Sequence, residues 1–178
     1  MALLGRRDDR QERREERRGG GDKEVFQMRE KLVSIGDDFW IETTGGRRAF
    51  KVDGKALRIR DTLVIRDLSG NEVARIQERK IAIRDTMSIE RPGRPDATIK
   101  KALINPLRER FTLTADDIGE ISIQGNIVDH EYEFESGGSK IAEVSKRWLR
   151  VRDTYGVEIS PGQDIALILA ATVALDQL

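Results

Sequence analysis

The sequence predicts a mainly β protein: a closed barrel of twelve strands around a buried, apolar C-terminal α-helix. Three observations support this. From Val25 onward, apolar residues alternate with polar ones between closely spaced turn residues, which is typical of strands. Two short motifs recur with the same spacing, as in a repeated hairpin unit. The chain then ends in an apolar run that is too short to cross a bilayer.

Length and composition narrow the class of protein. The chain has 178 residues, enough for one domain with a sizeable core. Its 32 basic and 32 acidic residues cancel, so no overall field attracts nucleic acid or an acidic membrane. There is no cysteine, which excludes disulfides and thiolate metal sites and suits a reducing compartment. The apolar start is too short for a signal peptide, so we expect a cytoplasmic protein, with peripheral membrane contact left open.

Residues 1–24 are predicted to form a charged tail, disordered or helical, ahead of a barrel domain over 25–178. Arg6 through Arg18 are only Arg, Asp, Glu and Gln, so the segment has no apolar stripe with which to dock on a core. The tail either keeps the protein soluble or makes an electrostatic contact with a partner or an anionic surface.

The strands are expected as six hairpin-like pairs, each with a long and a short arm. The long arms are expected at 25–35, 47–60, 72–84, 97–105, 119–129 and 139–152. The short arms are expected at 38–43, 62–67, 86–91, 109–114, 131–135 and 155–159.

Internal similarity supports this division. Val73–Ile76 resembles Ile141–Val144, and Ile83–Thr86 resembles Val151–Thr154 at the same offset; a third Arg-Asp-Thr copy lies within Ile59–Thr62. Because Asp bonds readily to nearby backbone groups, the repeated Asp predicts a turn, not a catalytic site.

In the long arms, the apolar positions shift by one residue midway, from Phe50 and Val52 to Leu57 and Ile59 in the second arm. Such a shift predicts a bulge that bends the strand and helps close the barrel.

The last element is predicted to be a helix over about 161–177. Ser160 is expected at the N-cap, Pro161 at the first helical position and Gln163 at the third. Ile165–Leu175 is apolar on every side, and at about 16 Å it is too short for a hydrocarbon layer of about 30 Å. No transmembrane segment is expected, so this helix should fill the barrel, whose interior is too wide for side chains alone.

Five segments carry a resemblance to a known family: Lys31–Glu42, Phe50–Leu57, Gln124–Glu131, Trp148–Val157 and Asp164–Ala170. Together they resemble the LURP-one-related family, as found in bacterial proteins, over Val25 to Leu178. The resemblance implies a fold like the Tubby C-terminal domain and the phospholipid scramblases, a twelve-stranded barrel around a C-terminal helix. It implies no general enzymatic activity. Tubby-type domains bind phosphoinositide headgroups through surface Lys and Arg, scramblase-like relatives are linked to lipid movement, and plant members to defence.

The sequence departs from the scramblase pattern. Its last helix is too short to span a bilayer, no cysteine is available for palmitoylation, and residues 160–164 offer one carboxylate for calcium. Lipid scrambling through this helix is therefore not expected.

Two motifs could carry catalysis or a metal. His130, the only histidine, lies between Asp129 and Glu131 and is interpreted as a turn residue in preference to a catalytic or metal-binding imidazole. Asp116-Asp117 with Glu120 could bind a hard cation, but is more simply a hairpin turn. No catalytic residue, metal site or cofactor is predicted.

Basic residues are the better candidates for a binding site, because clustered Lys and Arg can hold lipid phosphates or a nucleic-acid backbone. The candidates are Lys100, Lys101, Arg108, Arg110, Lys146 and Arg147, with Arg91 and Arg94 nearby. The alternative is a solvated barrel exterior whose charges are balanced by Glu78, Glu109 and Glu143.

The two tryptophans receive different interpretations. Trp40 is expected in the core, and Trp148 either in a core corner or as a membrane-interface anchor.

The favoured hypothesis is a non-enzymatic binding module of the LURP-one-related type. Its partner would be anionic phospholipid headgroups (phosphoinositide-like) or a protein. The alternatives are a nucleic-acid binder, made unlikely by neutral charge and few aromatics, and an enzyme with a barrel-mouth site around His130. The oligomeric state does not follow from the sequence.

Overall fold

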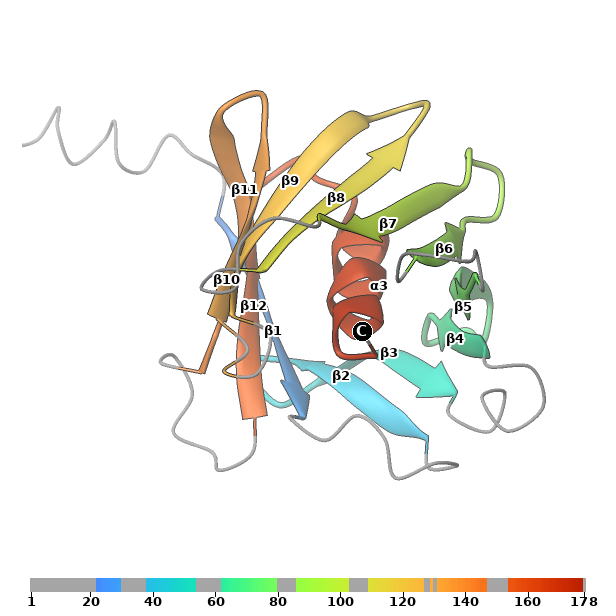
Figure 1. Ribbon diagram of the computed structural model, residues 1–178. Coiled ribbons are helices and arrows are strands. Elements are labelled where there is room, and N and C mark those ends of the chain that lie inside the picture. The colour runs from blue at the N-terminus through green and yellow to red at the C-terminus, as the bar shows by residue number, and fades with distance from the viewer. Residues whose placement is uncertain are drawn as a thin grey trace, which may run out of the picture.

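The computed structural model describes residues 22–29, 38–53, 62–79, 86–102, 109–126, 129, 131–146 and 154–177. Figure 1 shows strands arranged around one central helix. The strands are β1 (Glu24–Arg29), β2 (Phe39–Thr43), β3 (Arg48–Asp53), β4 (Thr62–Arg66), β5 (Glu72–Glu78), β6 (Thr86–Glu90), β7 (Ala97–Lys101), β8 (Glu109–Ala115), β9 (Gly119–Asn126), β10 (Glu131–Ser136), β11 (Ser139–Ser145) and β12 (Thr154–Ile159). The helix is α3 (Ile165–Leu175).

The twelve strands form a closed antiparallel barrel, as the sequence predicts. Each strand pairs with the next one along the chain, and β1 closes the circle on β12, from Glu24 opposite Ile159 to Arg29 opposite Thr154. The closed wall leaves no edge strand open to unregulated pairing with other chains.

The hydrophobic core lies between this wall and α3. Inward-pointing residues alternate with outward-pointing ones along the strands. Inward side chains such as Ile76 on β5 and Ile89 on β6 are almost fully buried. The helix is buried from Leu167 through Leu175, so the prediction that an apolar helix fills the barrel is confirmed. No helix in the described part of the chain is long and apolar enough to cross a membrane.

The predicted start of the helix is wrong. The N-cap is Asp164, whose side chain accepts a hydrogen bond from the backbone N–H of Leu167. Residues 161–163 form a turn in which Gly162 has φ of 77°, a left-handed conformation that a right-handed helix cannot contain. Ser160 and Pro161 therefore lie before the helix.

The internal repeats occupy equivalent places. Val73–Ile76 lies in β5 and Ile141–Val144 in β11. The threonines of the three Arg-Asp-Thr copies, Thr62, Thr86 and Thr154, each begin a strand. This agrees with a corner before each of these strands, although the aspartates themselves lie outside the described residues.

The mid-strand shifts predicted in the long arms fall largely in segments that the structure does not describe, as does the charged tail over residues 1–21. Register shifts are found elsewhere, between Ile41 and Glu42, between Ile65 and Arg66, and between Phe134 and Glu135. Each interrupts the pairing of a strand close to its hairpin turn.

Candidate functional site

Two of the predicted basic residues share the outer face of the barrel. Ile99 and Phe111 point into the core, so their neighbours Lys100 and Arg110 point outward, and both are exposed. Lys100 lies opposite Thr112, which places Arg110 diagonally across the β7–β8 pair, at a Cα separation of about 7–8 Å. Neither forms an ion pair with any described residue.

Lys101 does not join them. It lies opposite Phe111, with its Nζ 5.7 Å from the centre of that ring, and it pairs with Glu109 at 3.0 Å. Because side chains alternate along a strand, Lys100 and Lys101 point to opposite faces. The charge of Lys101 is balanced locally.

The remaining candidates do not extend the pair within the described chain. Lys146 follows the end of β11, which is separated from β7 by three intervening strands. Arg108 and Arg147 lie outside the described residues, as do His130 and Trp148. Of the six predicted basic residues, the structure therefore brings together Lys100 and Arg110.

Arg91 is a buried structural residue, only 5% exposed. Its guanidinium donates to the carbonyl oxygen of Pro95 at 2.5 and 2.9 Å, to Asp117 at 2.5 Å and to the helix cap Asp164 at 3.2 Å. Arg94 also pairs with Asp164, at 2.6 Å. This network ties the helix N-terminus to the β6–β7 and β8–β9 turns.

The network also includes Asp117, which lies in the acidic turn between β8 and β9. Residues 116–118 connect β8 to β9, and the hydrogen bond from Arg91 holds the pKa of Asp117 below its usual value. No group of three potential metal ligands occurs among the described residues. Asp116 and Asp117 lie in the turn between β8 and β9, as the sequence predicts.

Trp40 is not in the core, contrary to the sequence-based expectation. Ile41 is fully buried and Phe39 packs against the core, so the alternation of β2 directs Trp40 outward. The guanidinium carbon of Arg48, on β3, lies 4.4 Å from the centre of the Trp40 ring. Trp40 and Arg48 line a hollow of about 370 Å³ on the outer wall.

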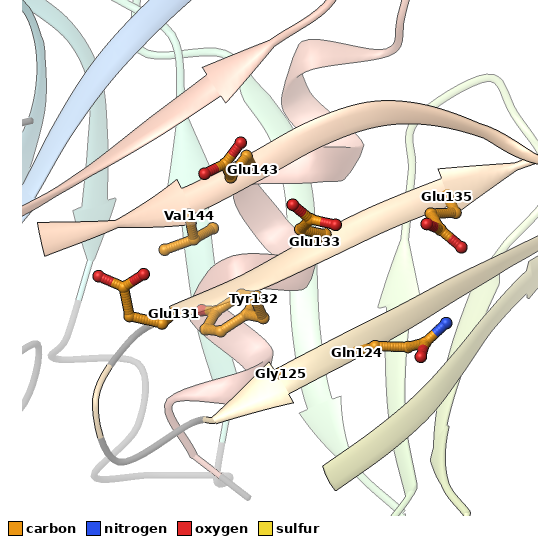
Figure 2. Close-up of a pocket in the computed structure, with 8 residues that line it drawn as sticks. All are labelled: Gln124, Gly125, Glu131, Tyr132, Glu133, Glu135, Glu143 and Val144. Carbon is orange, nitrogen blue, oxygen red and sulfur yellow. The ribbon is translucent and has the colours of Figure 1, made fainter. Parts of the chain in front are cut away.

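A second hollow of about 440 Å³ lies over β9, β10 and β11. Figure 2 shows Glu131, Glu133 and Glu135 projecting from β10, with Glu143 on the neighbouring strand. Lys140 balances part of this charge by pairing with Glu143 at 2.5 Å and Glu133 at 3.5 Å. Sequence reasoning missed this acidic wall, although Glu alternates with Tyr132 and Phe134 along the strand.

In the same region, the backbones of β9 and β10 approach each other closely. Gly125 has φ of 156°, and a Cβ at this position would lie 2.1 Å from the carbonyl oxygen of Glu131. A glycine is therefore required for β9 and β10 to pair as they do.

Two buried tyrosines lie inside the barrel near the C-terminal end of α3. The Tyr155 hydroxyl donates to Asp176 at 2.6 Å, whereas the buried Tyr132 hydroxyl has no hydrogen-bond partner among the described residues. Burial raises the pKa of both phenols well above its usual value, so both stay protonated. The hydrogen bond between Tyr155 and Asp176 is therefore a polar contact inside the core.

Comparisons with known proteins agree with this geometry. The search of curated proteins finds no match. The X-ray structure of an Arabidopsis thaliana protein is similar, with a TM-score of 0.61 and 17% identity over 87% of this chain and 90% of that one, a likeness that shows the fold alone. A profile of the LURP-one-related family matches residues 24–176. The chain belongs to the LURP-one-related family.

Proposed function

We propose that the protein is a non-enzymatic binding module that meets its partner on the outer wall of the barrel. The filled interior carries this proposal: α3 is buried from Leu167 to Leu175. The two hollows described above include outward side chains such as Glu133 and Trp40. Membership of the LURP-one-related family supports a binding role. A small-molecule site at the centre of the barrel would require the helix to leave.

The ligand that we propose is the anionic headgroup of a phospholipid, held at Lys100 and Arg110. Two exposed cations that lie diagonally across one strand pair, without ion pairs to described residues, can both approach one phosphate group. The hydroxyl of Thr112, opposite Lys100, can add a neutral donor. Such a contact would place the protein in the cytoplasm, peripherally at the membrane.

The contact is expected to be weak and sensitive to salt. Each basic residue near an anionic membrane contributes about 1 kcal/mol, so the pair contributes about 2 kcal/mol, or about 30-fold in affinity. Screening shortens the range of this attraction to about 8 Å at physiological ionic strength.

Flotation with phosphatidylcholine vesicles, with and without a phosphoinositide, tests the proposal. Lys100→Glu with Arg110→Glu should abolish co-flotation at low salt. The matched control, Lys23→Glu with Lys140→Glu, makes the same change in net charge at residues that are already paired with Glu158 and with Glu133 and Glu143, and should bind normally. Equal flotation of the two double variants, or none of the wild type at low salt, contradicts the proposal.

Other sources of phosphate are separated in the same experiment. Binding to DNA or RNA in a gel shift at low salt, without flotation, would favour the nucleic-acid alternative. An enzymatic role for His130 would require a turnover that His130→Gln removes. The relation to Tubby-like and scramblase-like proteins, and to bacterial members of the family, stays a prediction.

A further inference from the structure

We propose that the Arg-rich segment at residues 6–18 docks as an α-helix on the outer wall of its own barrel, across β10, β11 and β12. The surface that it meets is a row of three glutamates, Glu133, Glu143 and Glu158, which we call the acidic row. The contact lies within one chain and is separate from the proposed lipid site on β7 and β8.

The acidic row crosses three adjacent strands without a break. Glu133 of β10 lies directly opposite Glu143 of β11, which lies directly opposite Glu158 of β12. All three side chains are at least partly exposed. Neighbouring strands are about 4.8 Å apart, which sets the spacing of the row. Because like charges directly opposite each other destabilise a sheet, the row favours an added layer of positive charge.

The cations that pair with the acidic row neutralise only part of its surroundings. Lys140 pairs with two members of the row, at 2.5 and 3.5 Å, and Lys23 pairs with the third, Glu158, at 2.6 Å. Glu131 and Glu135 of β10 add two carboxylates beside the row, as Figure 2 shows. Five carboxylates against two ammonium groups leave a charge of −3 on this part of the wall.

The margins of this surface do not change its sign. Arg110 is two strands away from the acidic row, with Gln124 between them. Lys146 follows the end of β11, and Asp129 precedes the start of β10 at the same end of the barrel. Together these margins add one positive charge, so the surface stays negative.

The segment at residues 6–18 carries the matching charge on one side. Its seven arginines are Arg6, Arg7, Arg10, Arg13, Arg14, Arg17 and Arg18. At about 100° per residue, an α-helix over this segment places all seven within about 140° of its circumference. Its five acidic residues fall within about 120° on the opposite side. One face of such a helix is therefore wholly basic.

This helix is not favoured in isolation. Six of its i,i+4 pairs join like charges, such as Arg10 with Arg14, and one pair, Asp9 with Arg13, joins opposite charges. Like-charge pairs at this spacing destabilise a helix, whereas an anionic surface beside the arginines relieves their repulsion. Helix formation is therefore coupled to docking on the acidic row.

The dimensions of the helix and of the wall agree. A helical turn rises about 5.4 Å, close to the strand spacing of about 4.8 Å, so a helix that crosses the strands presents about one turn of arginines to each glutamate. Thirteen residues extend about 20 Å, enough to cross β10, β11 and β12. The hollow of about 440 Å³, lined in part by Glu133 and Glu143, gives room for arginine side chains.

The chain connection brings the segment to the correct strands. Only Gly19–Gly21 separate it from Asp22, where the described chain begins. The next residue, Lys23, already pairs with Glu158 at one end of the acidic row. Glycine permits the sharp change of direction that a return onto β12 requires. Exposed ion pairs are weak one at a time, so the contact depends on several together and is sensitive to salt.

A spin label on the segment tests the contact by NMR. The chain has no cysteine, so Gln11→Cys gives a unique attachment site, at the edge of the basic face. In the full chain at low salt, the label should broaden the amide signals of β10 and β11 and spare those of β5, on the far side of the barrel. The carbon shifts of residues 6–18 should be helical. About 1 M salt, at which the screening length is about 3 Å, should remove both effects.

Charge variants identify the docking surface. Glu133→Lys with Glu143→Lys should abolish the broadening of β10 and β11 and the helical shifts. The matched control, Glu78→Lys with Glu90→Lys, makes the same change in net charge on β5 and β6 and should keep both effects.

An exchange of charges completes the test. Arg10→Glu with Arg14→Glu should abolish the contact in the wild-type barrel and restore it in the Glu133→Lys, Glu143→Lys barrel. The proposal is overturned if the label leaves β10 and β11 unbroadened at low salt, or if the acidic-row variant and its control behave alike. It is also overturned if spin-labelled chains broaden β10 and β11 of separate isotope-labelled chains in a mixture, because the contact would then involve a second copy.

Discussion

Replacing Arg91 by Met removes the network that ties the helix to the barrel wall while keeping most of the side-chain volume. Arg91 donates four hydrogen bonds, two to Pro95, one to Asp117 and one to Asp164. Hydrogen bonds that involve charged groups contribute about 1.5–3 kcal/mol each, but Asp164 keeps Arg94 and the Leu167 amide as partners. We therefore expect a loss of about 2–4 kcal/mol, below the simple sum, from a total of about 5–15.

Urea unfolding followed by circular dichroism measures this loss as a lower midpoint at an unchanged slope. Arg91→Lys is the matched control: it keeps the charge but cannot reach three partners with a planar fork, so its loss should be smaller. A midpoint within error of the wild type for Arg91→Met would refute the idea that this network holds the helix. A changed slope would indicate an altered native or denatured state instead.

Three further predictions concern the helix, the acidic turn and a strand contact. Leu169→Glu places an unpaired charge inside the barrel and should abolish cooperative thermal unfolding, whereas an unchanged melting temperature contradicts a buried helix. Because the pKa of Asp117 is lowered in the folded state, this carboxylate contributes stability that is present above its usual pKa of 3.8 and is lost as pH falls through the folded value. Asp117→Asn should therefore reduce the loss of stability at acid pH. An unchanged loss would contradict the pairing with Arg91. Gly125→Ala should cost more than about 2 kcal/mol in urea unfolding, since its Cβ would meet the carbonyl oxygen of Glu131, and a fully stable variant would show that β9 and β10 can separate.

The barrel could be predicted because its signals are local and repeated. Alternation of apolar residues sets which side chains face the core, and the apolar run Ile165–Leu175 coincides with the observed helix. The same alternation places Lys100 and Lys101 on opposite faces and Trp40 outside, provided that Phe39 and Ile41 are assigned to the core first. The expectation that Trp40 lies in the core did not apply this alternation to its neighbours Phe39 and Ile41.

Other features depend on contacts between distant residues. The motif after Ser160 fits a helix cap as well as a turn, and the choice of Asp164 goes with its pairing to Arg91 and Arg94, about seventy residues earlier. The described pairing of β1 with β2 covers two residue pairs, and no local pattern in either strand indicates this.

Native-state hydrogen exchange of the α3 amides from Ala170 to Val173 tests the central claim most directly. If the helix is enclosed by the barrel, these amides should exchange only through global unfolding, with an opening free energy equal to that from urea. Exchange at rates close to those of an unstructured peptide, while the β5 and β6 amides stay protected, would show that the helix leaves the barrel on its own and that the interior is open to ligands.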